Sequence, residues 1–425
     1  MSLRGVVNLF SAFDPQRPMT LRSTLPAALL TLLALGGTAM AQDITATIRG
    51  TVQFDAVAVA EGTLPAGQTI ATGGNFRRIR LNLGGRIGED WSYEFMPRLE
   101  ASSIHFIAIG NAWVQYDGWR DVRLRVGAFA PPTNFEDATS SGETLFLERA
   151  QPADLARSTV GSPGRSAVSL FGYDERYFAA LSWTGGLIND AIDRQQAIVA
   201  RAAWRPWFED QDGVAIGINV SHLYAPPRTG ATHDLRLRQR PELNTKVVDL
   251  RLVDTGNLDS NSLTTIGLEA AGNLGALYAQ GGVFRMLLDR AAPAVSDPAF
   301  GGWYAQASWF LTGETRSWRA SRGGYGMPEP AQGFPEDGWG AWEVALRYSQ
   351  SDLDHRAGLP GTVALPDAVR GGKQDIVTLG LNWYPTDKLR LMLNYQNVIV
   401  DRLDGGGGDR GAALDLVSLR TQFAF

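Results

Sequence analysis

Cysteine is absent from the 425 residues, and lysine and histidine are rare. Without cysteine the chain has no disulfide framework, thiolate metal site or cysteine nucleophile. The four histidines, His105, His222, His233 and His355, show no metal-ligand spacing with one another. No GxSxG, HExxH or P-loop pattern occurs either. We therefore expect no enzyme activity, no metal, no cofactor and no nucleic-acid partner.

Long apolar runs are also missing after the N-terminus, so no spanning helix is expected. Near the N-terminus, Arg22 precedes an apolar run over 25–35, and small residues ending in Ala39-Met40-Ala41 follow. These are the parts of a cleavable secretory signal. A membrane anchor is the alternative, but the run is too short to span a bilayer. We expect residues 1–41 to be the signal with an upstream extension, Met19 the true start, and 42–425 the mature chain.

The rest of the chain alternates between apolar and polar side chains. Ile79, Leu81 and Leu83 face away from Arg78, Arg80 and Asn82, and the C-terminal segment 417–425 repeats the pattern. A period of two predicts β-strands with one polar face. The 48 glycines and 10% aromatic residues suit an all-β chain with many turns.

Segment length and aromatic placement decide between a soluble sandwich and a membrane barrel. Many segments run about 9–12 residues, the length of a tilted spanning strand. Trp113, Tyr116, Trp204 and Trp207 lie near segment ends, as in the aromatic girdles of outer-membrane barrels. Arginines on the polar face would line water, whereas in a dry sandwich core they would need partners. The sequence predicts a transmembrane antiparallel β-barrel in the bacterial outer membrane.

About sixteen strands are expected, an even number. They lie near 43–57, 74–87, 90–101, 107–117, 121–130, 166–172, 176–184, 196–206, 213–224, 262–272, 275–289, 300–313, 339–351, 374–384, 387–400 and 412–425. Short periplasmic turns alternate with long external loops, as in bacterial barrels, except that 314–338 is long on the periplasmic side. An extra strand at 247–253 would break this parity, so we place that segment in a loop.

The segment 131–165 is too long for an ordinary loop. A sixteen-stranded barrel with an unfilled lumen would be a wide water channel. We expect this segment to fold inward and narrow the lumen; a plain surface loop is the alternative. It contains Arg149 and several carboxylates, and no lysine.

Arginine is the main chemical signal, because only three of the 39 basic residues are lysines. Arg236, Arg238 and Arg240 recur at a period of two and would form a row that binds oxyanions. A solvated loop edge and biased codon use are the alternatives. A second cluster contains Arg77, Arg78 and Arg80. Four further arginines are expected to point into the lumen: Arg49, Arg98, Arg123 and Arg125.

Several segments together resemble the phosphate-selective porin O and P family, over about 74–425. These are 76–81, 91–95, 123–129, 147–150, 240–242, 254–256, 303–314, 340–349 and 380–385. The resemblance implies a sixteen-stranded barrel, a homotrimer, loops folded into the lumen and a periplasmic connection tucked inward. It also implies that Arg236, Arg238 and Arg240 correspond to an arginine ladder, and Arg77 and Arg78 to a constriction pair. The departure is lysine, since three in the whole chain cannot form a lysine cluster.

From these features we expect an outer-membrane porin that gives passive diffusion of small anions, with phosphate or polyphosphate as first candidates. The pore-lining set is Arg77, Arg78, Arg80, Arg123, Arg125, Arg149, Arg236, Arg238 and Arg240. A general non-selective porin is the alternative. A membrane-embedded hydrolase would need a Ser/His pair on one rim, and a structural barrel would have no open pore.

Overall fold

In a computed structural model of the chain, the described residues are 43–99, 107–190, 193–227, 234–240, 242–243, 247–248, 250–328 and 338–425. Ile44–Phe425 forms one compact unit. The predicted signal over 1–41 lies outside the described residues. No helix among the described residues is long and apolar enough to cross a membrane.

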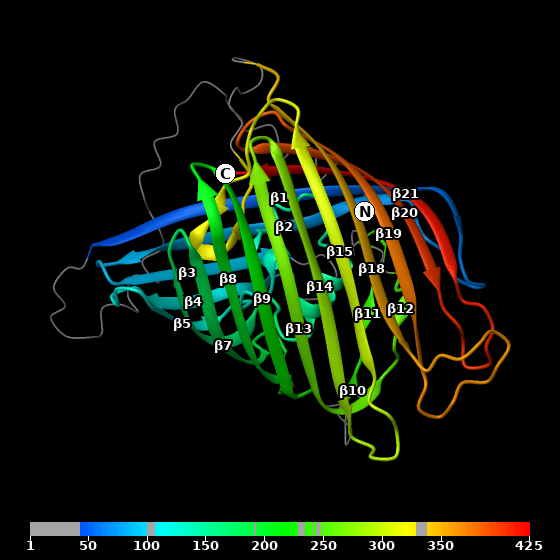
Figure 1. The fold of residues 1–425 in the computed structure, drawn as a ribbon. Coiled ribbons are helices and arrows are strands. Elements are labelled where there is room, and N and C mark those ends of the chain that lie inside the picture. The colour runs from blue at the N-terminus through cyan, green and yellow to red at the C-terminus, as the bar shows by residue number, and fades with distance from the viewer. Residues whose placement is uncertain are drawn as a thin grey trace, which may run out of the picture. The chain divides into compact units, whose positions relative to one another are not determined.

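Sixteen antiparallel strands form the barrel wall (Figure 1). They are β1 (Ile44–Thr63), β2 (Gly73–Ile87), β3 (Trp91–Leu99), β4 (Ile107–Tyr116), β5 (Arg123–Ala128), β6 (Arg165–Tyr173), β7 (Tyr177–Leu187), β8 (Gln196–Glu209), β9 (Asp212–Ala225), β13 (Leu258–Leu274), β14 (Leu277–Arg290), β15 (Ala299–Phe310), β18 (Ala341–His355), β19 (Val369–Tyr384), β20 (Leu389–Asp401) and β21 (Ala412–Ala424). Each pairs with the next, and β21 pairs with β1, so the wall is closed. In Figure 1 the blue β1 and the red β21 run side by side.

The predicted count and order of the strands are confirmed, with most ends within a few residues. The largest difference is β1, which extends to Thr63 because it pairs with β21 as far as Ala413. The segment 247–253 adds no strand to the wall, as its assignment to a loop predicts. The segment between β9 and β13 contains β10 (Asp234–Leu235), which pairs with the start of β13. It also contains β11 (Arg238–Gln239) and β12 (Val253–Asp254), which pair with each other.

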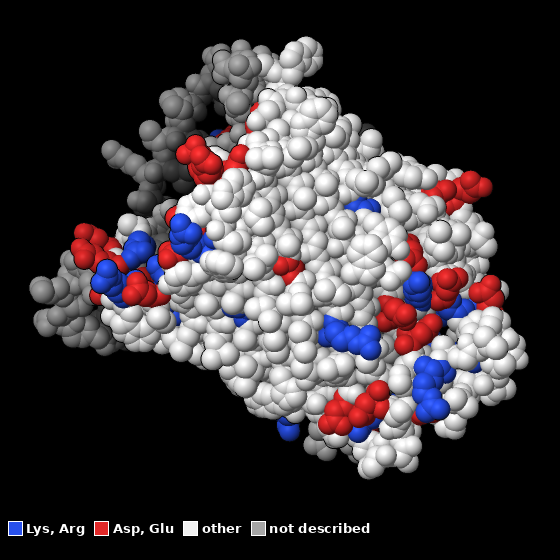
Figure 2. Space-filling view, viewed as in Figure 1, with Lys and Arg blue, Asp and Glu red and all other residues white. Residues whose placement is uncertain are grey.

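The two faces of the wall differ in polarity, as the alternation predicts. On β21, Leu419 and Phe423 are exposed on the outer face, while Arg420 and Gln422 are buried inside the barrel. Figure 2 shows few charged side chains across the middle of the outer face, with most of them gathered toward its two ends. The outer face therefore suits lipid, and the polar groups point to the lumen.

The long connection 129–164 between β5 and β6 folds into the barrel, as predicted. It contains two short helices, α1 (Phe135–Ala138) and α2 (Gln151–Ser158). Asn134 caps α1 by accepting the Asp137 N–H at 2.8 Å. Helix α2 starts with Pro152 in its first turn and packs against β14, β15 and β18. Phe146 and Ala150 are fully buried, so this connection is part of the protein interior.

The end of the lumen beside the long connection 226–257 is partly filled by apolar side chains. Leu235, Leu237 and Val253 from the connection 226–257 pack with Leu155 of α2 against inward residues of the wall such as Leu416. The inserted segments therefore cover the apolar residues that point inward from this end of the wall. The filling lies along β8–β9, β13–β15 and β18–β21 and leaves the β2–β6 side less occupied.

The connection between β15 and β18, 311–340, is long, as predicted, and its described stretch 311–328 enters the barrel from the end opposite to the loops 226–257 and 356–368. Short strands β16 (Trp318–Arg319) and β17 (Gly324–Tyr325) flank a 3-10 turn, η3 (Ala320–Arg322). Arg316 forms a fully buried ion pair with Glu343 of β18, with 2.9 Å between Nε and Oε1. Arg322 reaches Glu143 of the other inserted segment at 2.8 Å. The two inserted segments therefore contact each other inside the barrel.

Candidate functional site: an arginine-lined cavity

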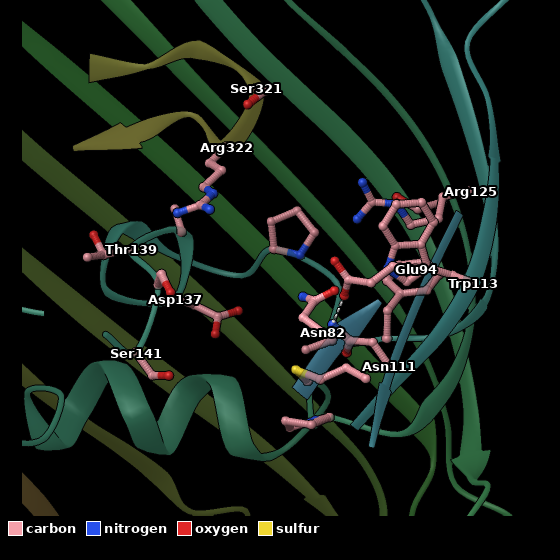
Figure 3. A pocket seen from close by; sticks show the side chains of 18 of the residues that line it. Asn82, Glu94, Asn111, Trp113, Arg125, Asp137, Thr139, Ser141, Ser321 and Arg322 are labelled. Carbon is pink, nitrogen blue, oxygen red and sulfur yellow. Dashed lines mark hydrogen bonds between the residues drawn. The ribbon is translucent and has the colours of Figure 1, made fainter. Parts of the chain in front are cut away.

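A cavity of about 620 Å³ lies between the β2–β7 wall and the inserted segment 129–164. Eight arginines and two carboxylates line it: Arg77, Arg78, Arg80, Arg98, Arg125, Arg149, Arg157, Arg322, Glu94 and Asp137. Figure 3 shows Asn82, Glu94, Asn111, Trp113 and Arg125 on one side, and Asp137, Thr139, Ser141, Ser321 and Arg322 on the other. Its lining is therefore strongly cationic.

A β-bulge places Arg77 and Arg78 on the same side of β2. Gln53 of β1 pairs with Arg78, but the next residue, Phe54, pairs with Phe76 and skips Arg77. An extra residue of this kind re-aims a side chain that regular alternation would direct outward. Arg77, Arg78 and Arg80 therefore all line the cavity.

Glu148 of the inserted segment is the shared partner of three wall arginines. Arg77 donates to both of its carboxylate oxygens at 2.7 and 3.0 Å, Arg420 approaches to 3.1 Å and Arg78 to 3.6 Å. Burial alone would raise the pKa of Glu148, but these three positive charges hold that pKa well below its ordinary value. Arg420 also binds Asp55 at 2.6 Å. The inserted segment is thus fixed to the wall by charge.

Three lining arginines lack an acidic partner among the described residues. Arg80 donates to the Ser141 hydroxyl at 2.7 Å, and Arg149 donates to the carbonyls of Glu136 and Thr139. Arg125 donates to the Gln115 side-chain oxygen at 2.6 and 2.9 Å. Neutral acceptors hold these guanidinium groups in place and leave the charges of Arg80 and Arg149 uncompensated, whereas the carboxylates of Glu94 and Asp117 act on Arg125 without forming an ion pair with it. Such groups can take up oxyanions bidentately.

The two lining carboxylates are both engaged. Glu94 accepts from Asn111 at 2.6 Å, and Asp137 lies 3.5 Å from Arg157. Arg157 also pairs with Asp154 of its own helix at 3.0 Å. Asp137 is therefore paired with an arginine, whereas Glu94 is held by a neutral amide and its charge offsets part of that of Arg125. The positive charge that remains in the cavity comes mainly from Arg80 and Arg149.

A family model described as phosphate-selective porin O and P matches residues 47–425. The chain belongs to this porin family. Porin O of Pseudomonas aeruginosa is 26% identical over 362 residues, which cover 79% of this chain and 78% of that protein. An uncharacterised protein of Caulobacter vibrioides is 26% identical over 376 residues, covering 82% and 67%.

The fold is likewise that of solved porins. An anion-selective porin from Comamonas acidovorans matches with a TM-score of 0.52 at 13% identity, covering 90% of this chain and 100% of that one. OmpT of Vibrio cholerae, an outer-membrane protein, matches with a TM-score of 0.52 at 9% identity, covering 92% and 100%. Family and fold are those of an outer-membrane channel.

The predicted arginine row of this porin lies apart from the cavity. Arg236 and Arg238 are exposed on one face of their segment, while Leu235 and Leu237 are buried on the other, as the period of two predicts. Arg236 forms a bidentate ion pair with Asp254, with 2.7 Å between Nε and Oδ1. These arginines line a second cavity of about 320 Å³, and Arg240 lines neither.

Five of the nine predicted arginines therefore meet in one cavity: Arg77, Arg78, Arg80, Arg125 and Arg149. Arg123 lies next to this group without lining it. Its guanidinium carbon is 3.9 Å from the Tyr173 ring centroid, and its Nε is 3.7 Å from Asp117. Of the other arginines expected to point inward, Arg98 lines the cavity and Arg49 is exposed.

The interpretation of Trp113 as a girdle residue is wrong. It lines the cavity, with the guanidinium carbon of Arg125 4.2 Å from its ring centroid. Inward-pointing Asn111 and Gln115 share its face of β4, whereas Val114 is exposed on the outer face. The alternation around 111–115 could have revealed this, because Trp113 has the same parity as these two amides.

Several lining residues are absent from the predicted pore-lining set. Arg157 and Arg322 reach the cavity from the two inserted segments, and Asn82 and Asn111 reach it from the wall. The asparagines share faces with predicted lumen residues, so the period of two contained the signal. Arg322 had none, because its position depends on how 311–328 folds.

One cluster outside the cavity bears on the hydrolase alternative. Ser296 Oγ lies 2.8 Å from His355 Nε2, so an external Ser/His pair does exist. However, Ser296 donates to Asp367 at 2.6 Å, and Asp367 also binds Arg356. In a catalytic triad the carboxylate orients the histidine, not the serine. The cluster joins three external segments and lacks triad geometry.

Proposed function

We propose that this porin passes small anions and that the arginine-lined cavity sets its selectivity. The observation that carries the proposal is the uncompensated charge of Arg80 and Arg149 beside the space left by the inserted segments. Guanidinium groups replace part of an anion's hydration shell, and neighbouring weak sites allow release.

Local placement, not total charge, supports the anion preference. The whole chain has a formal net charge of −5, so a non-specific field would favour cations. Eight arginines against two carboxylates line the cavity beside the inserted segment 129–164. The anion-selective porin of Comamonas acidovorans, which shares the fold, adds support by analogy alone.

Phosphate is the first solute to test. The family description supports it, and arginine binds phosphate oxygens bidentately. The described part of 129–164 has no lysine, so arginines alone would do this work. We infer weak phosphate binding.

The direct test is the zero-current potential of the purified channel across a KCl gradient in a planar bilayer. We expect chloride to be more permeable than potassium, and phosphate at millimolar concentration to reduce the chloride current. A cation-selective channel would refute the proposal. Selectivity for anions without phosphate block would retain the anion channel and reject phosphate as the solute.

We also infer that three copies assemble around the β3–β5 part of the wall. Strand β5 has 6 residues, and a tilted strand needs about 9–11 to cross the hydrocarbon core. This part of the wall is too short to cover the hydrocarbon core, so we expect it to contact a neighbouring protein chain in place of lipid. OmpT of Vibrio cholerae has been solved as a trimer. Light scattering of the detergent-solubilised protein should give three times the chain mass; a monomer mass would contradict the assembly.

A further inference from the structure

We propose that the cavity prefers organic anions with a planar aromatic body over inorganic anions. The acidic group would lie at Arg80 and Arg149, and the ring against Trp113. This inference rests on the proposed anion channel and names the class of solute that the same cavity takes.

The size of the cavity exceeds what an inorganic oxyanion needs. At about 620 Å³ it falls within the range of about 300–1,000 Å³ in which pockets hold drug-sized ligands. A tetrahedral anion at Arg80 would leave most of this space to water. A solute with an organic body would fill it and displace that water.

The cavity has an arginine-rich side and an aromatic side. Arg77, Arg78 and Arg80 lie on β2, and Arg149 and Arg157 come from the inserted segment. The β4–β6 side instead presents aromatic rings, among them Trp113, Phe171 and Tyr173. An inorganic anion has no apolar surface that could pack against this aromatic side of the cavity.

Stacked planar groups already form the aromatic wall. The Arg125 guanidinium carbon is 4.2 Å from the Trp113 ring centroid and 5.1 Å from that of Phe171. Trp113 is only partly buried, so part of its surface remains open to the cavity. A planar ligand can extend this stack, because aromatic faces attract both rings and guanidinium groups.

Neutral amides complete the lining between the two walls. Asn82 and Asn111 border the same space, and Figure 3 shows both close to Trp113 and Glu94. Glu94 is held by Asn111 at 2.6 Å on this side, where it would repel an acidic group. The charge distribution therefore fixes an orientation, with the acid toward β2 and Arg149 and the ring toward β4.

The test compares current block by phenylphosphate and by inorganic phosphate in single channels. The measurement is made above about pH 8, where both compounds are mainly dianions and differ in the ring. We expect the half-blocking concentration of phenylphosphate to be about tenfold lower, the size of one aromatic stacking contact. Trp113→Leu should bring the ratio of the two blocking concentrations close to one, whereas Trp113→Phe should retain most of the difference.

Trp303→Leu is the matched control, since Trp303 is exposed on the outer face of β15. It should leave the ratio at the wild-type value. If both compounds block an anion-selective wild-type channel at equal concentrations, this inference is overturned and the proposed function still holds. A wild-type channel that selects cations would refute the proposed function itself. If the ratio of the two blocking concentrations falls close to one in both Trp113→Phe and Trp303→Leu, the effect is one of general packing. That result would also overturn the inference.

Discussion

Arg77 and Glu148 form a bidentate ion pair, at 2.7 and 3.0 Å, between wall strand β2 and the inserted segment 129–164. The pair exists because a bulge turns Arg77 inward beside Arg78. Glu148 thus fixes the segment that narrows the lumen and neutralises part of the arginine cluster. What remains uncompensated is the charge of Arg80 and Arg149.

Replacing Glu148 with glutamine should weaken the attachment of this segment. Arg77 and Arg420 would lose a buried charged partner, which typically costs about 3–5 kcal/mol. We expect a lower urea midpoint for unfolding from lipid vesicles, and larger current fluctuations in single channels. Glu175→Gln is the control, because the Glu175 side chain is 74% exposed and 3.8 Å from Arg205. Equal midpoints for both variants would contradict the role of Glu148.

The buried pair between Arg316 and Glu343 should hold the periplasmic segment in the barrel. Arg316→Met alone leaves Glu343 without its ionic partner and should lower unfolding stability by about 3 kcal/mol. The double variant Arg316→Met with Glu343→Met should recover most of the loss, because no buried charge is left unpaired. The same urea titration measures both. A double variant that is less stable than Arg316→Met would show that the pair contributes in another way.

Arg236→Ala combined with Arg238→Ala should lower anion selectivity only slightly. Asp254 already compensates Arg236, and both arginines lie outside the main cavity. The zero-current potential across a KCl gradient provides the comparison, with Arg80→Gln as the reference. If the double variant has the larger effect, the row at the external mouth is the main selectivity element.

The mature chain should begin at Gln42. The small residues that end at Ala41 match a signal cleavage site. Intact-mass measurement of protein extracted from outer membranes should give the mass of 42–425. A mass that includes 19–41 would show that the segment is retained.

Alternation was sufficient to predict the sixteen strands, their order and the lumen face of Arg78, Arg80 and Arg125, because lipid and water impose opposite polarity on the two faces. Alternation alone could not direct Arg77 inward, since a bulge breaks the period of two at that residue; Arg77 entered the predicted set as a neighbour of Arg78 and through the family resemblance. In the sequence, Glu148 is only one of several carboxylates in a long loop. Its role depends on contacts with Arg77 and Arg420, which are 71 and 272 residues away from it in the sequence. The local alternation of polar and apolar residues does not predict contacts over such sequence separations.

The central claim is that Arg80 and Arg149 set the anion preference, and the zero-current potential of Arg80→Gln with Arg149→Gln tests it most directly. A unit charge 4 Å from an ion contributes about 1 kcal/mol in bulk water, or about fivefold in permeability ratio. We predict at least that loss of chloride over potassium selectivity in the double variant. Arg285→Gln, on the outer face of β14, should keep the wild-type potential. An unchanged potential in Arg80→Gln with Arg149→Gln would contradict the account.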